Sequence, residues 1–223
     1  MKTSKVDNLT RKNKRSYNSV MKKSDSRKRL LELTKYIITR ADDDVFLGSV
    51  KLNKILFLGD FLYYRERGVS ITGQNYVHAK LGPIPEEMSY IKKHYEGKQF
   101  TTVLAESGPY TQKRLAALKN PNLNIFSADM ISFIDKIIEV VCSKTRITGT
   151  YISEYSHDYL GWLNTKMGEK IPYGTIFLEI KSKQVANLLD EIRTQQLIDR
   201  FDGRYGIDKR TQKNVIQIAP SNA

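Results

Sequence analysis

The chain has little of what a disulfide-stabilised, secreted or membrane-spanning protein needs. Cys142 is its only cysteine in 223 residues, so no internal disulfide can form. Its apolar runs are far shorter than the roughly 18 to 20 residues of a membrane-spanning helix. No apolar segment follows the basic N-terminus, as it would in a secretory signal. These features predict a cytoplasmic protein that makes no use of a membrane.

The residue patterns of common catalytic and cofactor sites are also missing. The sequence has no glycine-rich phosphate-binding loop, and His78, His94 and His157 do not have the spacing of metal ligands. The cluster of hydroxyl, imidazole and carboxylate groups that most resembles a catalytic site lies in residues 153–158. They share one stretch of backbone there, whereas a catalytic triad needs side chains from different elements. We predict no enzyme, metal or cofactor, and a hydrolase centred on residues 153–158 is the weakest alternative.

Positive charge is in excess and is concentrated at the N-terminus. The 37 lysines and arginines outnumber the 24 acidic residues, which gives a net charge of +13. Residues 1–29 hold eleven basic and two acidic side chains, a net +9, which leaves +4 for the other 194 residues. The candidates for binding nucleic acid or an acidic partner are Arg11, Lys12, Lys14, Arg15, Lys22, Lys23, Arg27, Lys28 and Arg29. Such an arm binds by counterion release, but it can equally be a solvated leader that keeps the protein soluble.

Apolar residues three and four apart predict several helices. The first runs from about Ser24 to Arg40, with a cap at Ser24, Asp25 or Ser26. The clearest helical pattern predicts a helix that is capped by Ser49 and ends before Gly68. We expect the polar residues of this helix to emerge on its flank; they are Lys51, Lys54, Asp60 and Arg65. Lys51 or Lys54 could instead face a partner.

The remaining pattern adds a small amount of β-structure and further helices. We predict a short strand at 76–81, a helix at 86–95 with Pro85 in its first position, a β-hairpin within 98–118, and helices at 127–141, 150–155 and 182–201. The fold class is therefore mainly α, a compact helical domain with a small β-hairpin or short antiparallel sheet. We divide the chain into a flexible basic arm (1–25), a main domain (26–183), and a C-terminal helix and tail packed on that domain (184–220).

Four segments in this order resemble a known family. They are Lys51–Asp60 (KLNKILFLGD), Ile71–Tyr76 (ITGQNY), Leu81–Pro85 (LGPIP), and Ser156-His157 with Trp162. Together they are similar to the Panacea domain, also called the SocA-like antitoxin or phage-associated domain, over about residues 30–180. The resemblance implies a mainly helical, non-enzymatic antitoxin of a bacterial or prophage toxin–antitoxin system. Such a protein neutralises a protein toxin, encoded next to it, by direct binding.

Eight residues are candidates for toxin binding, because they lie in or near these motifs or are aromatic anchors of the kind found at protein interfaces. They are Lys54, Tyr63, Tyr64, Tyr76, Gly82, Pro83, His157 and Trp162. For each tyrosine, a half-buried core position remains an open alternative. Two other functions also stay open. The protein could be an adaptor that delivers the toxin to an ATP-dependent protease, or a DNA-binding regulator that uses the basic arm.

Overall fold

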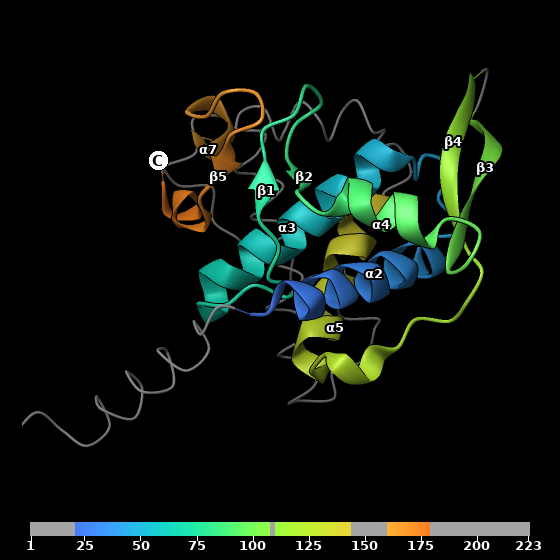
Figure 1. Ribbon diagram of the computed structural model, residues 1–223, viewed down its shortest axis with the longest axis horizontal. Coiled ribbons are helices and arrows are strands. Elements are labelled where there is room, and N and C mark those ends of the chain that lie inside the picture. The colour runs from blue at the N-terminus through green and yellow to red at the C-terminus, as the bar shows by residue number, and fades with distance from the viewer. Residues whose placement is uncertain (1–20, 108–109, 144–159, 179–223) are drawn as a thin grey trace, which may run out of the picture.

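Three helices form the centre of the molecule. The computed structural model describes residues 21–107, 110–143 and 160–178. Within them, α3 (Ser49–Arg67) packs against both α2 (Lys23–Arg40) and α5 (Ala128–Ile138), as Figure 1 shows. The small sheets lie around these helices, so the predicted class, mainly α with a minor β-component, is confirmed.

Helix α3 is buried on nearly all sides, which is typical of the central helix of a domain. Its buried apolar residues are Leu52, Ile55, Leu56, Phe57, Phe61, Leu62 and Tyr63. Gly59 lets α5 approach closely, because a Cβ atom at this position would overlap the side chain of Ile134. Polar side chains in the middle of this helix therefore have no solvent-exposed flank on which to emerge, whereas Arg65 in the last turn is half-buried and Arg67 is exposed.

The helix ends agree only partly with the predicted caps. Helix α5 is capped by Ser127, whose hydroxyl accepts a hydrogen bond from the Met130 N–H at 3.2 Å, as predicted. Gly68 follows α3 in a left-handed conformation with a φ of 74°, also as predicted. The predicted N-terminal caps of α2 and α3 are wrong, because the N-cap residue of α3 is Gly48 rather than Ser49, and no side chain caps α2.

A three-stranded antiparallel sheet covers one side of α3 (Figure 1). Its strands, in spatial order, are β2 (Ile84–Pro85), β1 (Tyr76–Val77) and β5 (Lys170–Ile171). Strand β1 is therefore shorter than the strand predicted at 76–81. Pro85 pairs with Tyr76 instead of starting a helix. The Glu86 N–H donates to the Asn75 carbonyl at 2.9 Å, which prolongs this pairing and delays α4 to Met88–Tyr95.

The predicted β-hairpin is present and projects from the body at the opposite end from β5 and α7 (Leu160–Leu163), as Figure 1 shows. It consists of β3 (Phe100–Ser107) and β4 (Tyr110–Ala117), and β4 contacts α2. The other short elements are 3-10 turns at Leu123–Ile125 and Tyr173–Phe177 and a π-helical turn at Glu139–Ser143.

Several predictions concern segments outside the described residues. These are the arm at 1–20, the helices at 150–155 and 182–201, and the tail up to 220. Among the helices that the structure describes, none has both the length and the apolar character needed to span a membrane.

Candidate partner-binding site

Asp60 fixes a surface loop to the central helix. Its carboxylate is fully buried and accepts hydrogen bonds from the Thr72 N–H at 2.7 Å, from the Thr72 hydroxyl, and from the Tyr76 hydroxyl at 2.9 Å. Burial raises the pKa of Asp60, while these hydrogen bonds act in the opposite direction. The segment from Ile71 to Tyr76 is therefore tied to α3 through one side chain.

Lys54 fixes a second motif segment to the same helix. Its Nζ atom is buried and donates to the Leu81 carbonyl, and Gly82 and Pro83 beside it are buried too. Burial lowers the pKa of Lys54 from 10.5 to about 7. Lys54 and Asp60 thus hold two separate motif segments against α3.

The expectation that Lys51, Lys54 and Asp60 lie on an exposed flank is wrong, because all three are buried. Lys51 forms an ion pair with the carboxylate of Asp44, and both side chains are nearly inaccessible. Elements pack around α3 on several sides, so these three polar residues bind internal partners.

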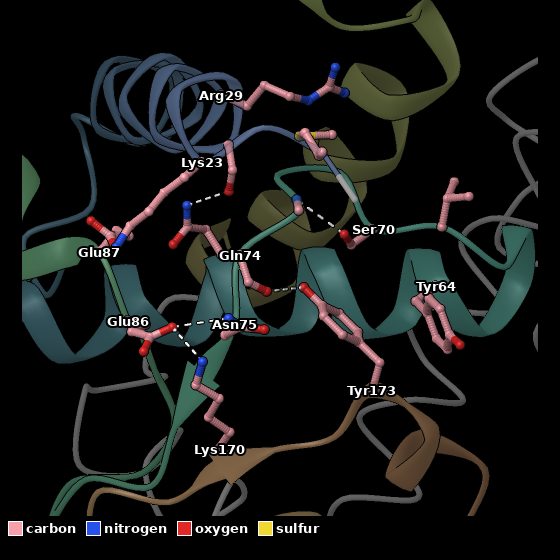
Figure 2. Close-up of a pocket in the computed structure, with 14 residues that line it drawn as sticks. Lys23, Arg29, Tyr64, Ser70, Gln74, Asn75, Glu86, Glu87, Lys170 and Tyr173 are labelled. Carbon is pink, nitrogen blue, oxygen red and sulfur yellow. Dashed lines mark hydrogen bonds and ion pairs between the residues drawn. The ribbon is translucent and has the colours of Figure 1, made fainter. Parts of the chain in front are cut away.

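The loop held by Asp60 forms one wall of a surface pocket of about 510 Å³ (Figure 2). The other walls come from the start of α2, the end of α3, and the residues after β2 and around β5. The lining residues are Met21, Lys23, Ser26, Arg29, Tyr64, Val69, Ser70, Gly73, Gln74, Asn75, Glu86, Glu87, Lys170 and Tyr173.

Gln74 links three parts of this pocket. Its carbonyl accepts a hydrogen bond from the Tyr173 hydroxyl at 2.7 Å, and its side-chain amide donates to the Ser26 hydroxyl at 2.6 Å, as Figure 2 shows. Burial raises the pKa of Tyr173 well above its ordinary value, so its phenol stays a neutral donor. These contacts give the pocket a fixed shape.

The rim of the pocket carries both signs of charge. Glu86 accepts a hydrogen bond from the Asn75 amide at 3.0 Å, which lowers the pKa of Glu86, and forms an ion pair with Lys170 at 3.2 Å. Glu87 pairs with Lys23 and Arg27, each at 2.6 Å. Burial would raise the pKa of Glu87, but the hydrogen bonds from these two cations outweigh it and lower the pKa.

Beside the pocket, three aromatic side chains form what we call the aromatic ridge: Tyr64, Tyr173 and Phe177. The ring centroid of Tyr64 lies 5.1 Å from that of Tyr173 and 6.2 Å from that of Phe177. Phe61 stacks on Tyr173 at 4.4 Å and supports the ridge from the core. Phe177 is 64% exposed, so it offers a large apolar contact surface.

Of the seven predicted toxin-binding residues that the structure describes, Tyr64 alone lines this pocket. Tyr63 and Tyr76 are buried, and the Tyr63 hydroxyl donates to Asp129 at 2.9 Å. Trp162 lies elsewhere, stacked on the ring of His78 with its Nε1 atom donating to the Ala79 carbonyl at 3.3 Å. Lys54, Gly82 and Pro83 are buried as described above, and His157 lies outside the described residues.

The predicted basic arm divides at the start of α2. Arg27 pairs with Glu87, and the Arg29 guanidinium donates to the carbonyls of Ile71 at 2.6 Å and Ile125 at 2.9 Å. These two arginines therefore belong to the folded domain. Lys22, Lys23 and Lys28 are exposed, whereas Arg11, Lys12, Lys14 and Arg15 lie outside the described residues.

Sequence reasoning did not identify several residues of the pocket. Gln74 and Asn75 stand inside the quoted ITGQNY segment, so that segment already contained a signal for them. Tyr173 and Phe177 lie in a 3-10 turn after Pro172, where no periodic pattern distinguishes them from other aromatic residues.

The fold and the site define a helical domain whose sequence motifs build a rigid surface pocket with an aromatic border. Within the described residues, no group of three or more His, Cys, Asp or Glu side chains could hold a metal ion. Residues 52–163, half of the chain, match the family described as Antitoxin SocA-like, Panacea domain. The chain belongs to this family. A search of curated proteins finds no match to it.

Proposed function

We propose that this protein is the antitoxin of a bacterial or prophage toxin–antitoxin pair and that it neutralises a protein toxin by binding to it. Membership of the SocA-like antitoxin family supports this function. We further propose that the pocket and the aromatic ridge make the contact. The observation that carries this assignment is the position of the exposed Phe177 ring, 6.2 Å from the ring of Tyr64, which lines the pocket.

A surface of this kind suits tight association with another protein. Interfaces gain most of their free energy from a few large aromatic or arginine anchors, and less ordering is needed on binding when the surface is already fixed. The ridge supplies the anchors, and Asp60 and Gln74 supply the rigidity. The charges of Glu86, Glu87 and Lys170 at the rim would select a complementary partner.

In this proposal the toxin is masked by contact, and no bond in it is made or broken. The test is growth of a bacterium that expresses the neighbouring reading frame from an inducible promoter, with and without this protein. We expect growth arrest that is relieved by co-expression, and co-purification of the two proteins from the rescued cells.

Matched surface variants connect this test to the site. Phe177→Ser removes an exposed ring from the ridge. The matched change Val45→Ser removes an apolar side chain from the loop between α2 and α3, at a residue that is 49% exposed. We expect Phe177→Ser to weaken the complex at least about tenfold, and Val45→Ser to leave it unchanged. Equal binding by both variants would contradict the site. A neighbouring product that is harmless, or whose toxicity is not relieved, would contradict the function.

The same cells distinguish masking from delivery to a protease. If masking is the mechanism, the toxin is present at an undiminished level in the rescued cells. Rescue that is accompanied by loss of the toxin, and that fails in a strain without the ATP-dependent protease, would instead support the adaptor.

A further inference from the structure

Strand β3 directs some of its backbone groups away from β4, the one strand that pairs with it in the described part of the chain. The Phe100 carbonyl accepts a hydrogen bond from the Gly97 N–H at 2.8 Å, and the Thr102 N–H donates to the Glu96 carboxylate at 2.6 Å. Both partners precede β3 in the chain and lie on its outer side. Because backbone groups alternate along a strand, Leu104 and Glu106 must also present their N–H and C=O groups outward.

The pairing of the hairpin agrees with this assignment. Gln99, next to Phe100, accepts a hydrogen bond from the Leu118 N–H at 2.9 Å, so odd-numbered residues of this segment face β4. Leu104 stands opposite Lys113, and Glu106 opposite Thr111, in pairs that exchange no backbone hydrogen bond. The outer edge of β3 is thus formed by Thr102, Leu104 and Glu106.

Glu96 covers only the inner end of this edge. Among the described residues, no hydrogen-bond partner is found for the outward backbone groups of Leu104 and Glu106. Leu104 is 73% exposed, and the hairpin lies at the periphery of the molecule (Figure 1). Exposed edges are prone to pair with other chains, and proteins commonly shield them. Here an apolar residue stands at the uncovered part.

We infer that an extended segment of the partner protein adds to β3 as a third strand over Leu104–Glu106, the part of the edge that Glu96 leaves uncovered. The outward N–H and C=O groups would bind its backbone. An apolar side chain of the segment would face Leu104, and a basic one would face Glu106, which is exposed at the outer end of the edge. This inference rests on the proposed function, since the partner is the proposed toxin, and it adds a contact separate from the pocket.

A second copy of the chain fits this edge poorly. Two β3 strands paired antiparallel about Leu104 would place Glu106 of each copy opposite Thr102 of the other. The Thr102 N–H is already bound by Glu96, so it could not donate to the incoming strand, and the carboxylates of Glu96 and Glu106 would be brought together. A partner segment that pairs with Leu104 and Glu106, and carries a basic residue opposite Glu106, avoids both problems because it does not need the Thr102 N–H.

The test uses the full-length protein and does not need the toxin. Displayed random peptides of roughly twelve residues, long enough for one added strand, are selected for binding to it. We expect bound peptides to alternate apolar and polar residues, with a basic residue near the apolar one, and to slow hydrogen exchange at the amides of Leu104 and Glu106.

Two proline variants supply the matched comparison. Leu104→Pro removes an outward N–H that takes no part in pairing with β4, and Lys113→Pro removes the corresponding N–H from the opposite edge of the hairpin. We expect Leu104→Pro to weaken peptide binding at least about tenfold and Lys113→Pro to leave it unchanged. Leu104→Lys, which keeps the backbone N–H but adds a charge to the edge, serves as a second variant if Leu104→Pro disturbs the fold.

Three results would overturn the inference. They are the absence of peptides whose binding depends on Leu104, unchanged exchange at its amide in the bound state, and a dimer of the wild-type protein that Leu104→Pro converts to a monomer. The last would show that a second copy occupies the edge. Failure of the growth test would overturn the proposed toxin partner alone, since peptide binding is measured without it.

Discussion

Asp60 and Thr72 are joined by two hydrogen bonds, one from the Thr72 main-chain N–H at 2.7 Å and one from its hydroxyl. A single buried side chain of α3 thereby determines the path of the loop that forms the pocket wall. Tyr76, which also donates to Asp60, begins strand β1. The core helix, the loop and the small sheet are therefore connected through one carboxylate.

Replacing Asp60 tests this connection. Asp60→Ala would leave buried donors of Thr72 and Tyr76 without an acceptor, and we expect it to lower the free energy of unfolding by about 3 kcal/mol. Tyr76→Phe removes one of the donors and should cost about 1 kcal/mol. Urea unfolding measures both, with the exposed Asp43→Ala as the control. A loss below about 1 kcal/mol for Asp60→Ala would mean that the loop does not depend on this carboxylate.

The ion pair between Lys51 and Asp44 gives a second prediction. Both side chains are buried, and Asp44 also accepts a hydrogen bond from the Phe46 N–H at 2.9 Å. Lys51→Met leaves a buried carboxylate without its cation and should destabilise the fold by about 3 kcal/mol. Asp44→Asn keeps an acceptor for Phe46 but removes the charge.

The double variant is the informative measurement for this pair. Combining Lys51→Met with Asp44→Asn should cost clearly less than the sum of the single changes, because neither charge is then left alone. Thermal or urea unfolding of the four proteins completes the cycle. Strict additivity would show that Lys51 and Asp44 do not interact in solution.

The sequence predicted elements well where a single physical rule determined the outcome. The periodic apolar residues of α3 and α5 predicted helices, Ser127 stood as a good cap before the apolar residues of α5, and Gly68 could adopt a positive φ after α3. The hairpin was expected from a strand-like segment at 100–104 and a Gly-Pro turn, although the sequence of the return segment also allowed a helical turn. These features depend on residues close together in the chain.

The polar residues of α3 were predicted incorrectly because their positions depend on distant segments. Nothing next to Lys54 in the sequence indicates that the Leu81 carbonyl will bind it, and Asp60 finds its donors in a loop twelve residues later. The same limit applies to Phe177, which lies near Tyr64 in a turn that follows β5, and β5 pairs with the distant strand β1. Motif segments could be recognised from sequence, but their mutual contacts could not.

Lys54 should make the stability of the protein depend on pH. Burial lowers its pKa from 10.5 to about 7 in the folded state, so between these values the unfolded chain binds more protons than the folded one. The free energy of unfolding should therefore rise as the pH increases from about 7 towards 10.5, by at most about 1.4 kcal/mol per pH unit. Lys54→Met should remove this rise.

Urea unfolding at several pH values between 7 and 10 compares the two proteins. Lys93→Met, a change at an exposed lysine of α4, is the control and should keep the wild-type slope. Parallel pH profiles for wild type and Lys54→Met would show that the Lys54 amine is no harder to protonate in the folded state than in the unfolded chain.

Deleting residues 1–20 tests the role of the basic arm without removing any of α2, which begins at Lys23. The deletion removes six basic side chains and one acidic one. If the arm attracts an acidic surface of the toxin, the shortened protein should associate with it more slowly at low salt, and the two proteins should become equal at high salt, where charges are screened. Association rates measured at several salt concentrations give the comparison.

Phe177→Ser should act differently and mainly speed dissociation, because it removes a contact made only in the bound state. Equal association rates for the two chain lengths at low salt would assign the arm no part in toxin binding, and a salt-dependent loss of DNA binding in the shortened chain would point to the regulator.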